Sequence, residues 1–249
     1  MSPGVASLLV RSEMRGVGHT REAARLGSHR FPRRHESPMT HGSATLKALR
    51  DLSAGAHWAL CGASGEFAAG SGAAMRVAPL AFMLDPEVEN DRRVVRDVAR
   101  ITHRNEEAYA GAVAVIVAIR ARARSSVRDL LDEAAAITPD SAVRDRLLEL
   151  QTLRKSPATI ATEFGNSGRV VDTVPLALYV ARSNMSLSLE TLLAEAAGLG
   201  GDTDTIAAIA GQISGAGVDC ADLPWPRIQQ IAEIAHVERG VNAFTRLLS

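Results

Sequence analysis

The chain has 249 residues, of which 46% are hydrophobic and 22% are charged, so it can build a sizeable core. Its 28 basic and 28 acidic residues give a formal net charge of zero, which argues against a nucleic-acid binder. The two longest stretches without a charged residue have 14 residues and are too short for a bilayer span, so we expect no membrane partner.

Residues 1–40 are predicted to be a basic, irregular arm that precedes a helical domain over residues 41–249. Met1–Glu36 contains seven arginines and no stretch with a helical period. It lacks the features of a secretory signal. Two readings stay open: a disordered arm, or a start that does not coincide with the natural domain boundary. A nucleic-acid or membrane role for Arg11–His35 rests only on local charge and is disfavoured, because Phe31 is its only aromatic residue.

From residue 41 onward the hydrophobic period predicts about ten closely spaced helices and hence an all-α, single-domain fold. Glu106–Arg120 is apolar on all sides and is predicted to be the central, buried helix. Ser126 and Asp129 resemble a capping box that opens a helix ending at Ile137. The other predicted helices are Ser43–Leu52, Asn90–Thr102, Ala142–Leu153, Val170–Ala181, Leu187–Ala197, Thr205–Ser214 and Ile228–Leu248.

The two cysteines, Cys61 and Cys220, are too few for a disulfide framework or a zinc cluster. A reducing cytoplasm is therefore the expected location, with both thiols buried.

The most specific local pattern is Gly200–Gly211, in which a glycine turn leads into an Ala/Ile-rich helix. Asp202 and Asp204 are two residues apart, and Thr205 follows them. Such oxygen donors suit a hard cation such as Mg²⁺. The alternative is helix capping, for which Asp and Thr are favoured residues.

Three further patterns are weak when taken singly. The small residues of Gly70-Ser71-Gly72 suit either an anion-binding turn or a tight joint between helices. Thr102-His103 forms a polar break between two apolar helices, where a hydrogen-bonded joint residue is the ordinary role. Asn166-Ser167-Gly168 leads into a predicted helix that contains Pro175, which marks a helix start or a kink.

Together and in this order, the four patterns resemble the ADP-ribosylglycohydrolase family. Members of that family carry a Gly-Asn-Gly-Ala-Ala-Met-Arg-x-Ala-Pro segment, a Thr-His, a Gly-x-x-Gly-x-Val segment that ends in proline, and a Gly-Gly-Asp-Thr-Asp-Thr-Ile segment. The corresponding stretches here are Gly70–Pro79, Thr102-His103, Gly165–Pro175 and Gly200–Gly211. The resemblance covers about residues 42 to 249 and implies an all-α fold.

The resemblance also implies a site with two Mg²⁺ ions that hydrolyses the bond between ADP-ribose and a protein side chain, or a related ADP-ribosyl compound. Asp202, Asp204 and Thr205 would ligate metal. Gly70, Ser71, Gly72 and the Asn166-Ser167-Gly168 loop would hold the ligand, and His103 would line its cleft. The expected partners are ADP-ribosylated proteins or small molecules that contain ADP-ribose. No catalytic residue is assigned.

Two departures from the family pattern are visible. The family's N-terminal Thr-Asp-Asp-Thr segment has no counterpart, since the chain has no adjacent Asp-Asp pair, and Ser71 stands where the family usually has Asn. Three explanations stay open for the missing segment: a reading frame that starts downstream or out of frame, an inactive relative, or a partner chain that supplies the missing ligands. The alternative function is a non-catalytic module that binds ADP-ribose or mediates helical interactions.

Overall fold

The structure of the chain is a computed structural model that describes residues 43–248. The all-α prediction is confirmed, since this part of the chain contains twelve α-helices and one sheet of two very short strands. The predicted basic arm lies outside the described residues. Among residues 43–248, no helix has both the length and the apolar character that a bilayer crossing requires.

The α-helices are α2 (Ser43–Ser53), α3 (Trp58–Cys61), α4 (Glu89–Arg100), α5 (Glu106–Ala123), α6 (Leu130–Ile137), α7 (Ala142–Gln151), α8 (Pro157–Phe164), α9 (Val170–Ser183), α10 (Leu189–Ala197), α11 (Thr203–Gly215), α12 (Trp225–Ile228) and α13 (Ile234–Leu248). Short 3₁₀ helices are η1 (Glu66–Ala68), η2 (Ala74–Arg76), η3 (Ala78–Phe82) and η4 (Cys220–Asp222). The parallel strands β1 (Ala63–Ser64) and β2 (His103–Arg104) pair Ala63 with His103.

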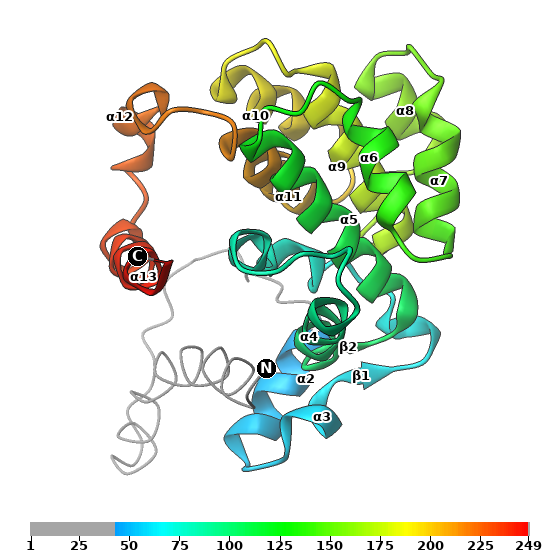
Figure 1. Cartoon of the computed structure of the whole chain (residues 1–249), viewed down its shortest axis with the longest axis vertical. Helices are drawn as coiled ribbons and strands as arrows, with labels where there is room; N and C mark the ends of the chain where they lie inside the picture. Colours follow the sequence, from blue (N-terminus) through cyan, green and yellow to red (C-terminus); the bar gives the residue numbers. More distant parts are fainter. Residues whose placement is uncertain (1–42, 249) are drawn as a thin grey trace. The chain divides into compact units, whose positions relative to one another are not determined.

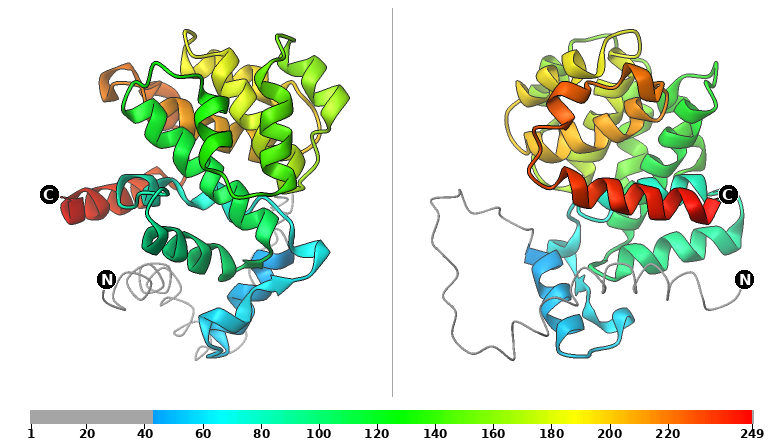
Figure 2. Two further views of the ribbon diagram at one scale, coloured as in Figure 1. Left: turned by 45° about the vertical axis from the view of Figure 1, so that its right-hand side comes forward. Right: turned by 90° about the vertical axis from the view of Figure 1, so that its left-hand side faces the viewer.

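Helix α5 lies at the centre of the fold, as its apolar sequence predicts. Thirteen of its 18 residues are buried. It packs against α4, α6, α7, α9 and α11, and Figures 1 and 2 show these helices gathered around it. Its first turn is capped by Asn105, whose side chain accepts hydrogen bonds from the backbone of Glu107 and Ala108. Helices α9 and α11, whose first residues border the candidate site described below, therefore both pack against α5.

The small residues of α5 let α9 approach closely. A Cβ atom on Gly111 would lie 2.3 Å from Cγ2 of Val170, at the first residue of α9. A side chain at Gly111 would push α9 outward, and the loop that precedes α9 would move with it. Small residues at helix contacts thus help to fix the position of the loop before α9.

Several boundaries differ from the sequence prediction. The capping box at Ser126 is wrong: Asp129 is itself the N-cap of α6, and the Ser126 hydroxyl instead donates to the buried Glu133 carboxylate. The predicted helix Ile228–Leu248 begins later, at Ile234, as α13, and Ile228 is instead the last residue of the short helix α12. Cys61 is buried as predicted, but Cys220 is exposed, because it lies in the short η4 segment and not in the core.

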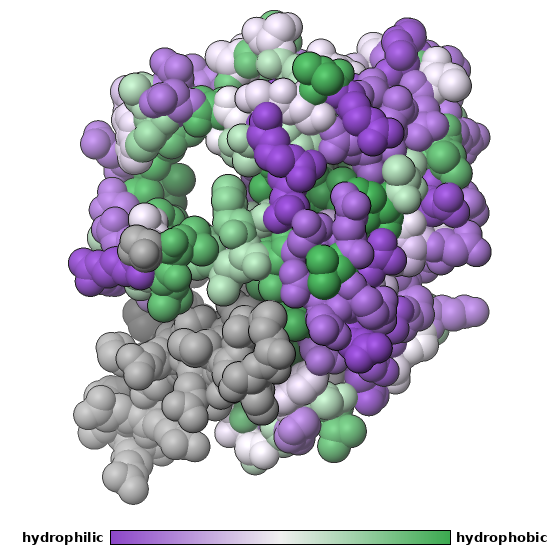
Figure 3. Space-filling model, viewed as in Figure 1, coloured by the Kyte–Doolittle hydropathy of each residue, from purple (hydrophilic) through white to green (hydrophobic). Residues whose placement is uncertain are grey.

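Helix α13 has apolar residues three to four positions apart and none of its residues is buried. Figure 3 shows apolar side chains on the surface of this helix. Val237, Val241 and Leu248 are among those that are exposed.

Candidate functional site

Asp202 precedes α11 on a turn that requires glycine. Gly200 and Gly201 have φ angles of 72° and 68°, in the left-handed region that other residues rarely adopt. Asp202 occupies the N-cap position, but its side chain makes no capping hydrogen bond. The carboxylate therefore does not cap the helix backbone, and its hydrogen bonds are with the Asp204 and Thr205 side chains.

The Asn166-Ser167-Gly168 loop lies directly on this turn. The backbone N–H of Asp202 donates to the carbonyl oxygen of Asn166 over 2.9 Å. The Asn166 side chain donates through Nδ2 to the carbonyl of Leu199 over 3.0 Å. A Cβ on Gly201 would lie 2.2 Å from the Asn166 carbonyl oxygen, so no larger residue fits there without movement of the loop.

The Asp202 carboxyl lies against Gly168 and beside Asp204 and Thr205. A Cβ on Gly168 would come within 3.1 Å of Asp202 Oδ2. Burial raises the pKa of the Asp202 carboxyl, the neighbouring Asp204 carboxyl raises that pKa further, and a hydrogen bond with Thr205 lowers it. Two acidic side chains thus lie side by side at the start of α11, an arrangement that a bound cation would stabilise.

The Gly70-Ser71-Gly72 segment and its neighbour Ala69 are hydrogen-bonded to the chain at Gly168–Val170, where the same loop ends. Gly70 and Arg169 form an antiparallel bridge, and the backbone N–H of Val170 donates to the carbonyl of Ala69 over 2.9 Å. The buried Ser71 hydroxyl donates to the Gly168 carbonyl over 3.4 Å. Backbone from two distant parts of the chain therefore borders the Asp202 carboxylate.

The ring of His103 packs against the Gly70-Ser71-Gly72 segment. Its ring faces both glycines, since a Cβ on Gly70 would lie 3.1 Å from Nε2 and one on Gly72 would lie 2.8 Å from Cε1. Its Nδ1 is hydrogen-bonded to the Thr102 hydroxyl over 2.7 Å. Burial, and secondly the charge of Arg76, lower the pKa of His103 to about 4, so the ring is neutral at pH 7. With 4% of its surface exposed, His103 shapes the Gly70–Gly72 turn.

Two residues that hold the site together, Arg76 and Gln212, were not predicted as site residues from the sequence. Arg76 donates to the carbonyls of Gly72 over 2.8 Å and of Val98 over 3.0 Å, which ties the segment to α4. Gln212 donates to the carbonyl of Met75 over 2.7 Å and so ties α11 to the same segment. Arg76 belongs to the Gly70–Pro79 motif, so the motif contained a signal; Gln212 showed none.

Asp172 is a third acidic residue near the loop, but its side chain is hydrogen-bonded to the Ser167 hydroxyl within the loop. Its Oδ2 accepts a hydrogen bond from the Ser167 hydroxyl over 2.6 Å, and its carboxyl lies against Gly165. The Thr173 hydroxyl donates to the Ser167 carbonyl over 2.6 Å. Ser167 is therefore engaged inside the loop, while its neighbour Gly168 borders Asp202.

All ten residues singled out from the sequence belong to one connected set of contacts. They come from four separate stretches of sequence, and the contacts run from His103 through Gly70–Gly72 and Asn166–Gly168 to Asp202–Thr205. Asp204 is exposed and Thr205 is buried.

The donor atoms at the start of α11 fit one hard cation. They are carboxylate and hydroxyl oxygens, the type that Mg²⁺ prefers, and Mg²⁺ commonly takes one or two carboxylates and keeps several waters. Within residues 43–248, no group of three or more His, Cys, Asp or Glu side chains is placed to hold a metal ion. Asp202 and Asp204 are the two acidic residues at the start of α11.

Comparisons with known proteins point to one family. The family model described as ADP-ribosylglycohydrolase matches residues 5–248, a longer stretch than the motifs cover. An uncharacterized protein of Archaeoglobus fulgidus is 34% identical over 179 residues, which are 70% of this chain and 57% of that protein. ADP-ribosylhydrolase ARH3 of Danio rerio is 28% identical over 235 residues, covering 77% of this chain and 62% of the relative.

Human ADP-ribosylhydrolase ARH3 is 29% identical over 199 residues, 65% of this chain and 54% of that enzyme. This chain therefore spans less than two thirds of the length of these curated relatives. A solved structure, the "ADP-ribosylglycohydrolase-related protein complex", aligns with a TM-score of 0.57 and 24% identity, over 84% of this chain and 70% of that one. At that identity, the likeness shows a shared fold.

Proposed function

The chain belongs to the ADP-ribosylglycohydrolase family, and we propose that it is a Mg²⁺-dependent hydrolase of the bond between ADP-ribose and a modified protein side chain or a related ADP-ribosyl compound. Family membership supports a hydrolase of ADP-ribose linkages. Metal dependence and the nature of the substrate are the parts that we add. We also propose a cytoplasmic location, which the low cysteine content favours.

One observation carries the proposal. The Asp202 carboxylate stands at a helix N-terminus without capping it, and it lies beside Asp204 and against Gly168. The carboxylate accepts no hydrogen bond from a backbone N–H of the first turn, as a simple N-cap would, and its hydrogen bonds are with the Asp204 and Thr205 side chains. The pair of carboxylates at the meeting point of the glycine-rich segments favours a ligand that contains a cation.

The residues divide into two proposed roles. Asp202, Asp204 and Thr205 would hold Mg²⁺, which when bound supplies Lewis-acid polarisation of a substrate oxygen. Gly70, Ser71, Gly72 and the Asn166-Ser167-Gly168 loop would bind and orient ADP-ribose, because these small residues border the Asp202 carboxylate. His103 would keep the Gly70–Gly72 turn in place. Among residues 43–248 we assign two carboxylates to this site, so one ion is expected at these residues where the family resemblance implies two.

The test is release of ADP-ribose from an ADP-ribosylated protein by the full chain, first with Mg²⁺ and then with EDTA. We expect release only with Mg²⁺, and its loss in Asp202→Ala and in Asp204→Ala. Asp132→Ala removes an exposed carboxylate on α6 and is the matched control, which should leave release unchanged. Release that persists in EDTA, or in both site variants, would contradict the proposal.

The second candidate is a module that binds ADP-ribose without hydrolysing it. The observation in its favour is the two-carboxylate site of residues 43–248, where the family pattern has a further acidic segment. Such a module would bind ADP-ribose equally well with and without Mg²⁺ and would release none from a modified protein. Mg²⁺-dependent release would rule it out.

A further inference from the structure

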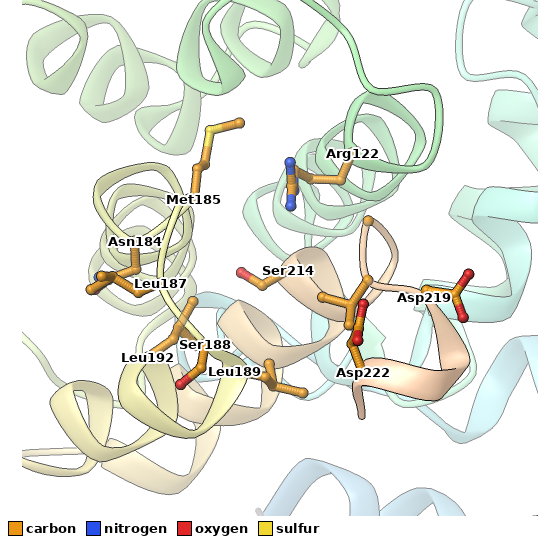
Figure 4. A pocket seen from close by; sticks show the side chains of 12 residues that line it. Arg122, Asn184, Met185, Leu187, Ser188, Leu189, Leu192, Ser214, Asp219 and Asp222 are labelled. Atoms are coloured by element: carbon orange, nitrogen blue, oxygen red, sulfur yellow. The ribbon is translucent and has the colours of Figure 1, made fainter. Parts of the chain in front are cut away.

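A cavity of about 300 Å³ lies at the opposite end of α11 from the Asp202 carboxylate. It is bordered by the ends of α5, α9 and α11, by the start of α10 and by the segment that follows α11 (Figure 4). Ser214 lines it, twelve residues along α11 from Asp202, so the rise of an α-helix separates the two by about 18 Å. The cavity is therefore distinct from the candidate ADP-ribose site.

Two buried polar groups on this cavity have no partner among the described residues. Ser214 is 7% exposed and its Oγ makes no hydrogen bond. The Nε–H of Arg122 is also buried and makes none. Figure 4 shows the guanidinium of Arg122 and the hydroxyl of Ser214 directed into the same space. Buried polar groups are normally hydrogen-bonded, so two unpaired ones on one cavity indicate that an acceptor oxygen is missing there.

The fold holds the Arg122 side chain in this position. Arg122 lies in the last turn of α5, and Gly217 lies against its guanidinium, since a Cβ on Gly217 would be 2.7 Å from an Nη atom. No carboxylate of residues 43–248 forms an ion pair with it. A guanidinium held in place beside a hydroxyl, without a direct ion pair to residues 43–248, is suited to a carboxylate ligand.

The opposite wall of the cavity is apolar. Leu187, Leu189 and Leu192 line it, whereas Val218 follows Gly217 on the Arg122 side. Asn184 also lines it, but its Nδ2 donates to the Val180 carbonyl over 2.8 Å and is already engaged. A ligand that satisfies both walls carries an anion at one end and a hydrocarbon chain at the other.

Two acidic residues limit the charge of that ligand. Asp219 and Asp222 line the cavity, and Asp219 accepts a hydrogen bond from the backbone of Ala221. With one cation and two carboxylates on the lining, a doubly charged phosphate would be repelled more strongly than a singly charged carboxylate.

We propose that this cavity binds a small monocarboxylate with a branched aliphatic chain. The carboxylate accepts hydrogen bonds from Arg122 and Ser214, and the chain packs on the leucines of the opposite wall. A volume of about 300 Å³ accommodates such an acid.

The experiment is a titration of the full chain with 4-methylpentanoate, followed by backbone amide NMR. We expect saturable shifts around residues 214–218 with a dissociation constant of about 1 mM, as suits so small a ligand. Arg122→Met keeps the aliphatic stem and should weaken binding at least about tenfold; Ser214→Ala should weaken it about threefold. Arg128→Met removes an exposed arginine outside the cavity and should change nothing.

The comparison probe is 3-methylbutylamine, which has a branched chain and no carboxylate. It should not bind, and inorganic phosphate should not bind either. The proposal is overturned if the amine or phosphate binds as tightly as the acid, if the acid does not saturate, or if binding survives in Ser214→Ala and Arg122→Met alike. Ser214→Ala removes one oxygen only, so it tests the proposal even if Arg122→Met does not fold.

Discussion

Single atoms fix the turn that presents Asp202. Gly200 and Gly201 both have positive φ, but only Gly201 faces the Asn166 carbonyl oxygen at 2.2 Å from an added Cβ. At Gly200 the nearest atom to an added Cβ is Asn166 Nδ2 at 3.6 Å, an ordinary contact. Gly200 and Gly201 therefore share a left-handed backbone conformation, but only Gly201 lacks room for a Cβ atom.

We predict that Gly200→Ala lowers the free energy of unfolding by about 1 kcal/mol, the cost of a left-handed alanine. Gly201→Ala should lower it by about 2 to 4 kcal/mol, because the collision with Asn166 is added to that cost. Urea denaturation of the two variants measures the difference. Equal decreases in the free energy of unfolding would show that the Asn166 loop does not collide with a Cβ atom at residue 201.

A pH prediction follows from His103, whose pKa falls from 6.5 to about 4 on burial beneath the glycine turn. The folded chain resists protonation of the ring, whereas the unfolded chain accepts a proton below pH 6.5. The stability that the neutral ring contributes is thus complete above pH 6.5 and is lost as the pH falls toward 4. Between pH 7 and pH 5 this loss is about 2 kcal/mol.

His103→Gln cannot titrate and should lose about 2 kcal/mol less than the unmodified chain over the same pH interval. The comparison is between slopes against pH, so any constant cost of the substitution cancels. Denaturant titrations at pH 7, 6 and 5 provide the slopes. Parallel slopes for the two chains would mean that His103 is not buried as a neutral ring.

At the scale of elements, the helices follow the hydrophobic period where the period is long. The central helix was predictable because Ala108–Ile119 is apolar on every side, and α5 begins at Glu106 as predicted. The short helix α8 was missed, although Ser156 and Pro157 are a standard start signal. Its eight residues make little more than two turns, which is too short a stretch to establish a period.

Capping of α8 is testable at Ser156, whose hydroxyl accepts a hydrogen bond from the Thr159 backbone over 3.2 Å. Ser156→Ala should reduce the free energy of unfolding by about 1 kcal/mol, because that backbone group loses its partner. Ser156→Asp restores an acceptor at the same place and should recover most of the loss. Thermal or urea unfolding distinguishes these results, and equal stability of all three chains would exclude a capping role.

The candidate site shows what sequence patterns carry and what they omit. Asp202, Asp204 and the glycines around them stand out because their residue types and spacing are unusual. Gln212 does not, since a glutamine in a helix has many ordinary uses, and Arg76 lies in the Gly70–Pro79 motif but its contacts do not follow from the motif. Their contacts join segments that lie 22 and 137 residues apart, and only the folded chain reveals them.

For the whole molecule, the contacts of the site link stretches from residue 70 to residue 205 through a shared central helix. Ligand binding at their meeting point should therefore require the complete fold and not a single motif. Dependence on Mg²⁺ distinguishes the two candidate functions, because a chain whose glycine-rich segments bind ADP-ribose without a cation would be a simple binding module.

The most direct test is a calorimetric titration of ADP-ribose into the full chain, first with Mg²⁺ and then with EDTA. We predict binding with Mg²⁺ that weakens at least about tenfold in EDTA, and an Asp204→Asn variant that shows the weak binding in both conditions. Binding of equal strength with Mg²⁺ and EDTA, or unchanged in Asp204→Asn, would contradict the metal-dependent account.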